Sequence, residues 1–91
     1  MIIVSYDIAD DKLRTKFSKF LEKFGHRIQY SVFEIDNSDR ILDNIVSEID
    51  NHFKRRFSQA DSVIIFIMSA SCRVIKYGYA CNEDHDLKVL I

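Results

Sequence analysis

Residues 1–14 read MIIVSYDIADDKLR, and their alternation indicates the first strand of the fold. Successive strand residues point to opposite faces, which carry Met1, Ile3, Ser5 and Asp7 on one side and Ile2, Val4, Tyr6 and Ile8 on the other. Because apolar residues occur on both faces, we predict a central strand over residues 1–8 whose two sides are both covered. Asp7 then stands where this strand ends, and a carboxylate at that position needs a physical reason.

The residues after the strand predict a helix that runs to about Phe24. Asp10 or Asp11 supplies the N-cap, and Gly25 suits a left-handed C-terminal cap. At about 100° per residue, the apolar side chains share one arc that we expect to be core: Leu13, Phe17, Phe20, Leu21 and Phe24. A separate narrow arc carries only lysines: Lys12, Lys16, Lys19 and Lys23. This stripe is either an ordinary solvated helix face or a surface that binds nucleic-acid phosphates.

The rest of the chain predicts one more helix and several strands. Residues 27–36, RIQYSVFEID, read as one strand with Arg27 and Phe33 on the same face. Asn37 and Ser38 cap a second helix, which ends in the basic run 54–56, and the negative end of the helix dipole is sufficient to account for these charges. Further strands are expected at residues 62–68, 73–79 and 87–91, the first of which is apolar on both faces.

This order of elements predicts a single α+β domain over residues 1–91, a two-layer sandwich with two helices on one side of a mostly antiparallel sheet. Two of the strands are apolar on both faces, yet the helices cover only one. A second copy of the chain is the simplest cover for the open face, so we predict a homodimer. The final strand, with Leu87, Val89 and Ile91, is a natural arm to add to the edge of the partner's sheet.

Charge and composition limit the function classes. The net charge is −1, but residues 28–53 carry six acids and one base, while the segments on either side of them each carry six bases and four acids. Such a chain can present a basic face without a basic isoelectric point. Its longest apolar run, residues 63–68, is too short for a membrane helix, and the acid at position 7 comes too early for a signal peptide, so we expect a cytoplasmic protein with no membrane contact. The cysteines and histidines lack the spacing of a metal site.

Two explanations of Asp7 stay open on the residues alone. It could cap the following helix or pair with Arg14 or Arg27. Alternatively, a two-fold axis could bring two copies of Asp7 together around one Mg²⁺ ion, which needs only one or two carboxylates besides water and phosphate ligands. Such a metal could polarise a phosphodiester. Two glycines are too few for a phosphate-binding loop, and no other catalytic motif is present.

The segments YDI, DDKLRTK and RIQYSVFE, in this order and spacing, resemble the CRISPR-associated protein 2 family, the small partner of the CRISPR integrase in spacer acquisition. The resemblance is close over residues 1–36 and holds at the level of elements beyond them. It implies a ferredoxin-like fold and a homodimer in which each C-terminal strand lies against the other protomer. It also implies that Asp7 of each subunit binds Mg²⁺ or Mn²⁺.

Four more positions match family residues that are linked to nuclease activity or its surroundings: Tyr6, Arg14, Arg27 and Phe33. The family often has an arginine two positions after Arg14, where this chain has Lys16, and a lysine lacks the bidentate fork of a guanidinium. The resemblance implies either a metal-dependent endonuclease that cuts RNA or DNA, or a non-catalytic adaptor that bridges integrase subunits and binds the spacer DNA duplex. A small-molecule regulatory domain of the same fold is a third interpretation, which no ligand-binding loop supports.

Overall fold

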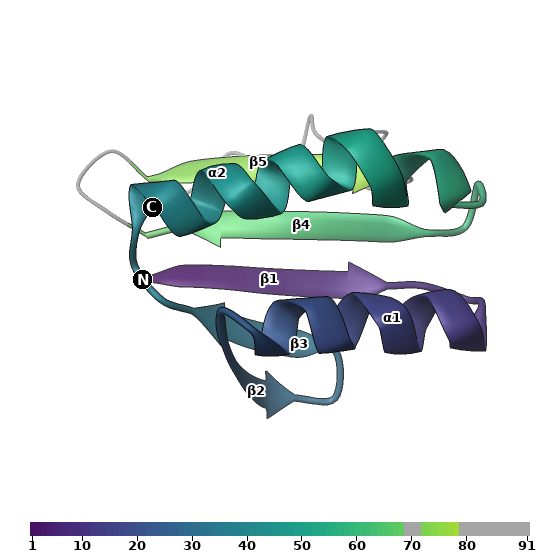
Figure 1. Ribbon diagram of the computed structural model, residues 1–91, viewed down its shortest axis with the longest axis horizontal. Helices are drawn as coiled ribbons and strands as arrows, with labels where there is room; N and C mark the ends of the chain where they lie inside the picture. The colour runs from purple at the N-terminus through teal and green to yellow at the C-terminus, as the bar shows by residue number, and fades with distance from the viewer. Residues whose placement is uncertain (69–71, 79–91) are drawn as a thin grey trace.

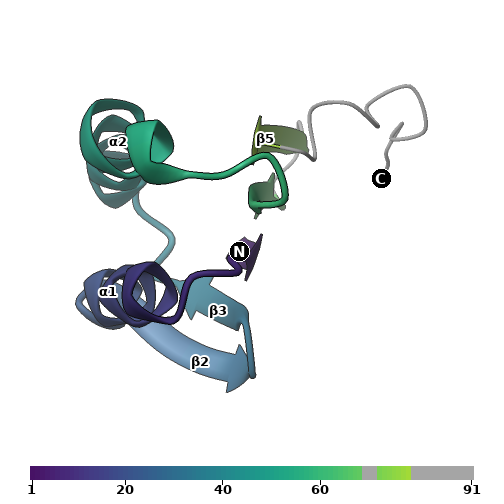
Figure 2. The same ribbon diagram turned by 90° about the vertical axis from the view of Figure 1, so that its right-hand side faces the viewer.

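The computed structural model describes residues 1–68 and 72–78, which form a two-layer α+β structure (Figure 1). The elements follow in the order β1 (Ile2–Asp7), α1 (Asp11–Glu22), β2 (Gly25–Gln29), β3 (Val32–Ile35), α2 (Asp39–Glu48), a π-helical segment η1 (Ile49–Phe53), a 3-10 turn η2 (Lys54–Arg56), β4 (Ser62–Ile67) and β5 (Arg73–Gly78). These strands form one antiparallel sheet in the order β2-β3-β1-β4-β5. Both helices lie on the same face of it (Figure 2). The predicted α+β sandwich is confirmed.

The core fills the space between the sheet and the helices. From β1, Ile2, Val4 and Tyr6 are buried on the helix side, as the alternation predicts. They meet buried side chains from the other elements: Leu13, Phe17, Leu21, Phe33, Ile35, Leu42, Ile45, Ile49, Phe53, Val63, Ile65 and Ile67. At the seam between the helices, the Phe17 and Phe53 rings meet edge to face with centroids 4.9 Å apart. This contact holds α1 against the end of the α2 unit, the helical stretch made of α2, η1 and η2.

The helix starts agree with the capping predictions. The Asp10 side chain accepts a hydrogen bond from the Leu13 N–H at 2.8 Å, and the Ser38 side chain accepts one from the Ile41 N–H at 3.3 Å. The first helix ends at Glu22, before the expected Phe24. None of the helices among residues 1–68 and 72–78 is long and apolar enough to cross a membrane.

The single strand expected over residues 27–36 is wrong. The chain reverses at Tyr30 and Ser31, so that β2 and β3 form a hairpin with a bulge at Ile28. The turn is held by Arg27, whose guanidinium donates to the Tyr30 carbonyl, and by the Ser31 carbonyl, which accepts from the Tyr6 N–H at 3.1 Å. The alternation of apolar and polar residues runs straight through this turn, which has no glycine, proline or asparagine to mark it.

The role expected for Gly25 is also wrong. Lys23 forms the C-terminal cap of α1 in a right-handed conformation, and Gly25 is already the first residue of β2. It pairs with Ile35 so closely that a β-carbon at position 25 would lie 2.8 Å from the Ile35 Cα. The position therefore requires glycine because two backbones approach each other, and not because of a positive φ.

The face of the sheet away from the helices is the open face. Register places Ile3 beside Phe66, Phe66 beside Val74, and Ser5 between Val32 and Ile64 on this face. All of these side chains are half-buried within the single chain, and no described element covers them. The uncovered apolar face that motivates the predicted homodimer is present. The strand expected at residues 87–91, with Leu87, Val89 and Ile91, lies outside the described residues.

Candidate functional site

Asp7 is the last residue of β1, next to Ser62 of β4. It follows the buried Tyr6, so its side chain lies on the open face, and it is exposed. Its carboxylate forms no hydrogen bond or ion pair with any described residue, including Arg14 and Arg27. The cap of α1 is Asp10 instead. Both structural explanations of Asp7 are thus wrong for residues 1–68 and 72–78, and none of these residues binds its carboxylate.

The backbone just after Asp7 is held from two sides. The Arg14 guanidinium donates to the Ile8 carbonyl at 2.9 Å and to the Ala9 carbonyl at 3.4 Å, and it pairs with Asp11. On the other side, the carboxylate of Asp61 accepts from the Ala9 N–H at 2.9 Å and from the Ser58 N–H at 2.8 Å. The exit of β1 is therefore fixed to α1 and to the loop before β4, which gives Asp7 a defined position.

Asp61 is a residue that the sequence analysis missed. Its side chain is buried, although carboxylates are rarely buried without partners. The signal in the sequence is an acid directly before the apolar strand of residues 62–67, much as Asp7 is an acid at the end of the first apolar strand. Both acids flank central strands that are neighbours in the sheet, and they meet the same end of it.

Three of the residues predicted to be catalytic come together on the helix side of the sheet. A pocket of about 170 Å³ between α1 and the β2–β3 hairpin is lined by Tyr6, Arg14, Thr15, Ser18, Arg27 and Tyr30. The fourth residue, Phe33, is buried beside this pocket, and the Arg27 Cζ lies 5.0 Å from the centre of its ring. This cation–π contact holds the guanidinium over the aromatic face.

The titratable groups of this pocket are two arginines and the Tyr6 phenol, together with Tyr30. Burial raises the pKa of the Tyr6 hydroxyl above its usual value, and the nearby Arg27 opposes only part of that effect. The hydrogen bond to Asp11 raises the pKa of Arg14. At neutral pH the pocket thus holds a protonated phenol and two guanidinium groups, of which Arg14 pairs with Asp11 and Arg27 lies 3.8 Å from the Glu22 carboxylate, and the raised pKa of Tyr6 makes it a poor general base.

The structure does not bring Asp7 into that pocket. Tyr6 and Asp7 are consecutive strand residues, so the pocket lies on the helix side of the sheet while Asp7 lies on the open face. No group of three histidine, cysteine, aspartate or glutamate side chains in the described part of the chain is arranged to hold a metal. A cation at Asp7 would need its other ligands from water, from a nucleic acid or from a second copy of the chain.

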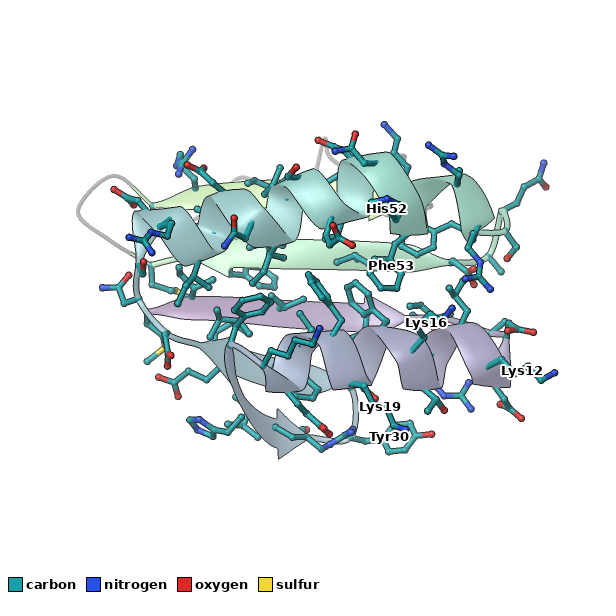
Figure 3. The ribbon with its side chains drawn as sticks, in the orientation of Figure 1. Lys12, Lys16, Lys19, Tyr30, His52 and Phe53 are labelled. Carbon is teal, nitrogen blue, oxygen red and sulfur yellow. The ribbon has the colours of Figure 1, made fainter. Side chains whose placement is uncertain are left out.

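The four predicted lysines are exposed along one side of α1. Lys16, Lys19 and Lys23 line a groove of about 550 Å³ between α1 and the end of the α2 unit, while Lys12 lies beyond it near the helix start (Figure 3). None of the four makes an ion pair with another described residue. The stripe predicted from helical periodicity is thus a continuous exposed cationic surface.

Comparisons with known proteins agree with the resemblance. The family model of the CRISPR associated protein Cas2 matches residues 1–74. A protein named CRISPR-associated endoribonuclease Cas2 from Rhodospirillum rubrum is 34% identical over 70 residues, which are 77% of this chain and 54% of that protein. A relative of the same name from Synechocystis is 32% identical over 76% of this chain and 72% of its own length. The matched region thus spans little more than half of the first relative.

One solved structure is similar in fold and in sequence. The crystal structure of a hypothetical protein from Thermus thermophilus aligns with a TM-score of 0.61 and 31% identity, over 76% of this chain and 80% of that one.

Proposed function

Because this chain belongs to the CRISPR associated protein Cas2 family, we propose that it acts in spacer acquisition as a homodimer that joins the CRISPR integrase and that cleaves RNA or DNA phosphodiesters with Mg²⁺. The observation that carries this proposal is the exposed Asp7 carboxylate, which follows a strand whose exit is held in place and which forms no hydrogen bond or ion pair with the described residues. The two relatives are named endoribonucleases, and these names support the reaction class.

The metal site in this proposal is shared between two protomers. A cation with a preference for oxygen ligands, Mg²⁺ or Mn²⁺, would be held by Asp7 of each copy together with water, and would polarise the scissile phosphodiester. The position of Asp7 on the open face, which also carries the apolar residues expected in the dimer, supports this arrangement. Within each protomer, Arg14 has the task of holding the two carbonyl groups that follow Asp7.

Arg27, Tyr6 and Phe33 have a different role in this scheme from direct contact with the metal. Their pocket lies on the other face of the sheet from Asp7, and Arg27 is tied to the β2–β3 turn through the Tyr30 carbonyl. In this scheme Arg27, held over the Phe33 ring and in the same pocket as Tyr6, offers a positive site for a phosphate of the nucleic acid.

The second candidate function is a non-catalytic adaptor, in which the dimer only bridges integrase subunits and binds the spacer DNA duplex. The exposed lysine stripe on α1 favours it, because a row of unpaired cations binds phosphates without any catalytic group. The two functions differ in what Asp7 does, so one substitution separates them.

We expect Asp7→Ala to abolish Mg²⁺-dependent cleavage of RNA or DNA while the dimer and its binding to the integrase persist. Removing a carboxylate that holds the metal removes the polarisation of the phosphodiester, and a loss of about 100- to 1000-fold in rate is typical for such electrostatic groups. Cleavage would be measured with end-labelled RNA and DNA at several Mg²⁺ concentrations and in a chelator.

The matched control is Asp43→Ala, which removes an exposed carboxylate from the outer side of α2. It should cleave like the unaltered protein. If Asp7→Ala cleaves as fast as the control, the Asp7 site is not catalytic. If the unaltered protein never cleaves but assembles the integrase on duplex DNA, the adaptor is the correct function.

A further inference from the structure

A groove runs between the two helical units on the outer side of the helix layer. Its floor contains the Phe20 and Phe53 rings, whose centroids lie 5.3 Å apart, and Figure 3 shows Lys16 and Phe53 between the two helices. One wall comes from α1, with Lys16, Lys19 and Lys23, and the other comes from η1 and η2. The groove is about 550 Å³ in volume.

The second wall adds two arginines that the helix dipole does not fully explain. Lys54, Arg55 and Arg56 all follow the second helix, but only Arg55 and Arg56 line the groove, opposite the lysines of α1. A favourable interaction with the dipole requires positive charge near the helix end and nothing more. It does not require that two arginines face a row of lysines across a hollow, where like charges repel.

The balance of charge in the groove is strongly positive. Five cations line it with a single carboxylate, Glu48, and the His52 Nδ1 lies 3.1 Å from that carboxylate. None of the five cations forms an ion pair or a hydrogen bond with another residue of the described chain. Cations that gather without partners over a partly apolar floor focus a positive potential, and a bound polyanion would relieve their repulsion.

The groove continues beyond its own walls. A second hollow of about 410 Å³ lies along α1 and shares Lys16 and Lys19 with the groove, and it extends the cationic surface to Lys12. From Lys12 to Lys23 the helix rises about 16 Å. Successive phosphates of one strand advance 3.4 Å along the duplex axis and lie farther apart along the strand itself, so this length spans at most about five of them. It exceeds what a mononucleotide needs and favours a nucleic-acid strand as the ligand.

We propose that this groove is a nucleic-acid site in which the phosphates of one strand lie between α1 and η2, contacted by Lys16, Lys19 and Lys23 on one side and by Arg55 and Arg56 on the other. The inference rests on the proposed function for the class of ligand, and it adds a second wall to the lysine stripe. The site is on the helix layer, so it is separate from Asp7 on the open face.

The test compares two double variants with the same net charge. Arg55→Gln with Arg56→Gln removes the arginine wall, while Arg40→Gln with Lys54→Gln removes two exposed cations that do not line the groove. Binding of a fluorescein-labelled DNA duplex would be followed by anisotropy at several salt concentrations, with a chelator present so that no cleavage occurs. Thermal melts of both variants would establish that they are folded.

We expect the wall variant to bind at least about tenfold more weakly than the control, with a slope of log Kd against log salt lower by about 1.8, since each phosphate contact contributes about 0.9. Equal binding by the two variants would overturn the proposal. So would displacement of the duplex from the unaltered protein by micromolar inorganic tripolyphosphate, which would identify the groove as a site for small polyphosphates. Asp7→Ala leaves the groove intact, so we expect it to bind the duplex like the unaltered protein even where it no longer cleaves.

Discussion

The carboxylate of Asp61 joins two loops at the end of the sheet where Asp7 lies. Its side chain is 1% exposed, and its two oxygens accept from the backbone N–H groups of Ala9 and Ser58. Those donors have no other described partner, so they depend on this one side chain. Hydrogen bonds to a charged acceptor are stronger than neutral ones, and a buried donor without a partner costs more than the bond contributes.

We expect Asp61→Ala to lower the free energy of unfolding by about 2–4 kcal/mol, because it leaves two backbone N–H groups without a hydrogen-bond acceptor and creates a small cavity. Asp61→Asn should cost less, since its amide keeps one acceptor oxygen. Urea denaturation of both variants would give the values, with the exposed Asp50→Ala as a control that should change stability by less than about 0.5 kcal/mol. An Asp61→Ala protein as stable as this control would show that water replaces the carboxylate.

The site residues differ in how far the sequence predicts them. Alternation predicts that Asp7 ends the first strand on the open face, and the structure places it there, while its role in binding a metal stays a prediction. Asp61 is missed because its partners, Ala9 and Ser58, are backbone groups, and a backbone N–H carries no signature in the sequence. The same limit applies to Arg14, whose contacts are mostly carbonyl groups of the preceding loop.

The β2–β3 hairpin is the element that periodicity describes least well. Strand alternation depends on side chains, and it continues unbroken through Tyr30 and Ser31, where the backbone reverses. The turn is stabilised instead by the Arg27 side chain of the same hairpin and by the Tyr6 backbone of β1. The helices and the central strands are predicted well, because each buries one continuous apolar stripe or face against the core.

Gly25 offers a test of how tightly this hairpin is built. A β-carbon there would fall within contact distance of the Glu34 carbonyl and 2.8 Å from the Ile35 Cα, both of which are backbone atoms that cannot move aside. We expect Gly25→Ala to destabilise the fold by about 1–3 kcal/mol, the usual cost of forced overpacking. The midpoint of thermal unfolding should fall by about 4 °C or more for a domain of this size.

The companion measurement is Gln29→Ala at the other end of β2, where the side chain is exposed. It should leave the unfolding midpoint within about 2 °C of the unaltered value, since it keeps the backbone pairing. If the unfolding midpoint of Gly25→Ala equals that of Gln29→Ala, the β2 strand adapts to a β-carbon and the close approach is not a requirement of the fold.

The two surfaces proposed to act in function lie on opposite layers. The groove of Lys16, Lys23, Arg55 and Arg56 is on the outer side of the helices, while Asp7 is on the open face of the sheet. A dimer that forms through two open faces would bury the apolar side chains, bring two copies of Asp7 toward the axis, and leave both grooves outside. The two grooves would then lie on opposite outer sides of the particle, so each would bind its own stretch of nucleic acid unless the duplex bends around the dimer.

Phe66 tests this arrangement, because it lies on β4 between Ile3 and Val74 on the open face. We expect Phe66→Lys to convert the dimer to a monomer in sedimentation velocity, since a charge placed within an apolar interface is costly to desolvate. A stable interface needs about 800 Å² per partner. Among the described residues, the open face is the apolar surface that no element covers.

Asn44→Lys, an exposed change on α2, is the control and should stay dimeric. The monomer should lose metal-dependent cleavage, because one Asp7 per particle no longer meets its copy, but it should keep a groove that binds DNA with the salt slope of a single site. A Phe66→Lys protein that stays dimeric would place the interface elsewhere. A monomer that still cleaves would show that one Asp7 is enough to hold the metal, and the shared site would then be wrong even though the open face is the interface.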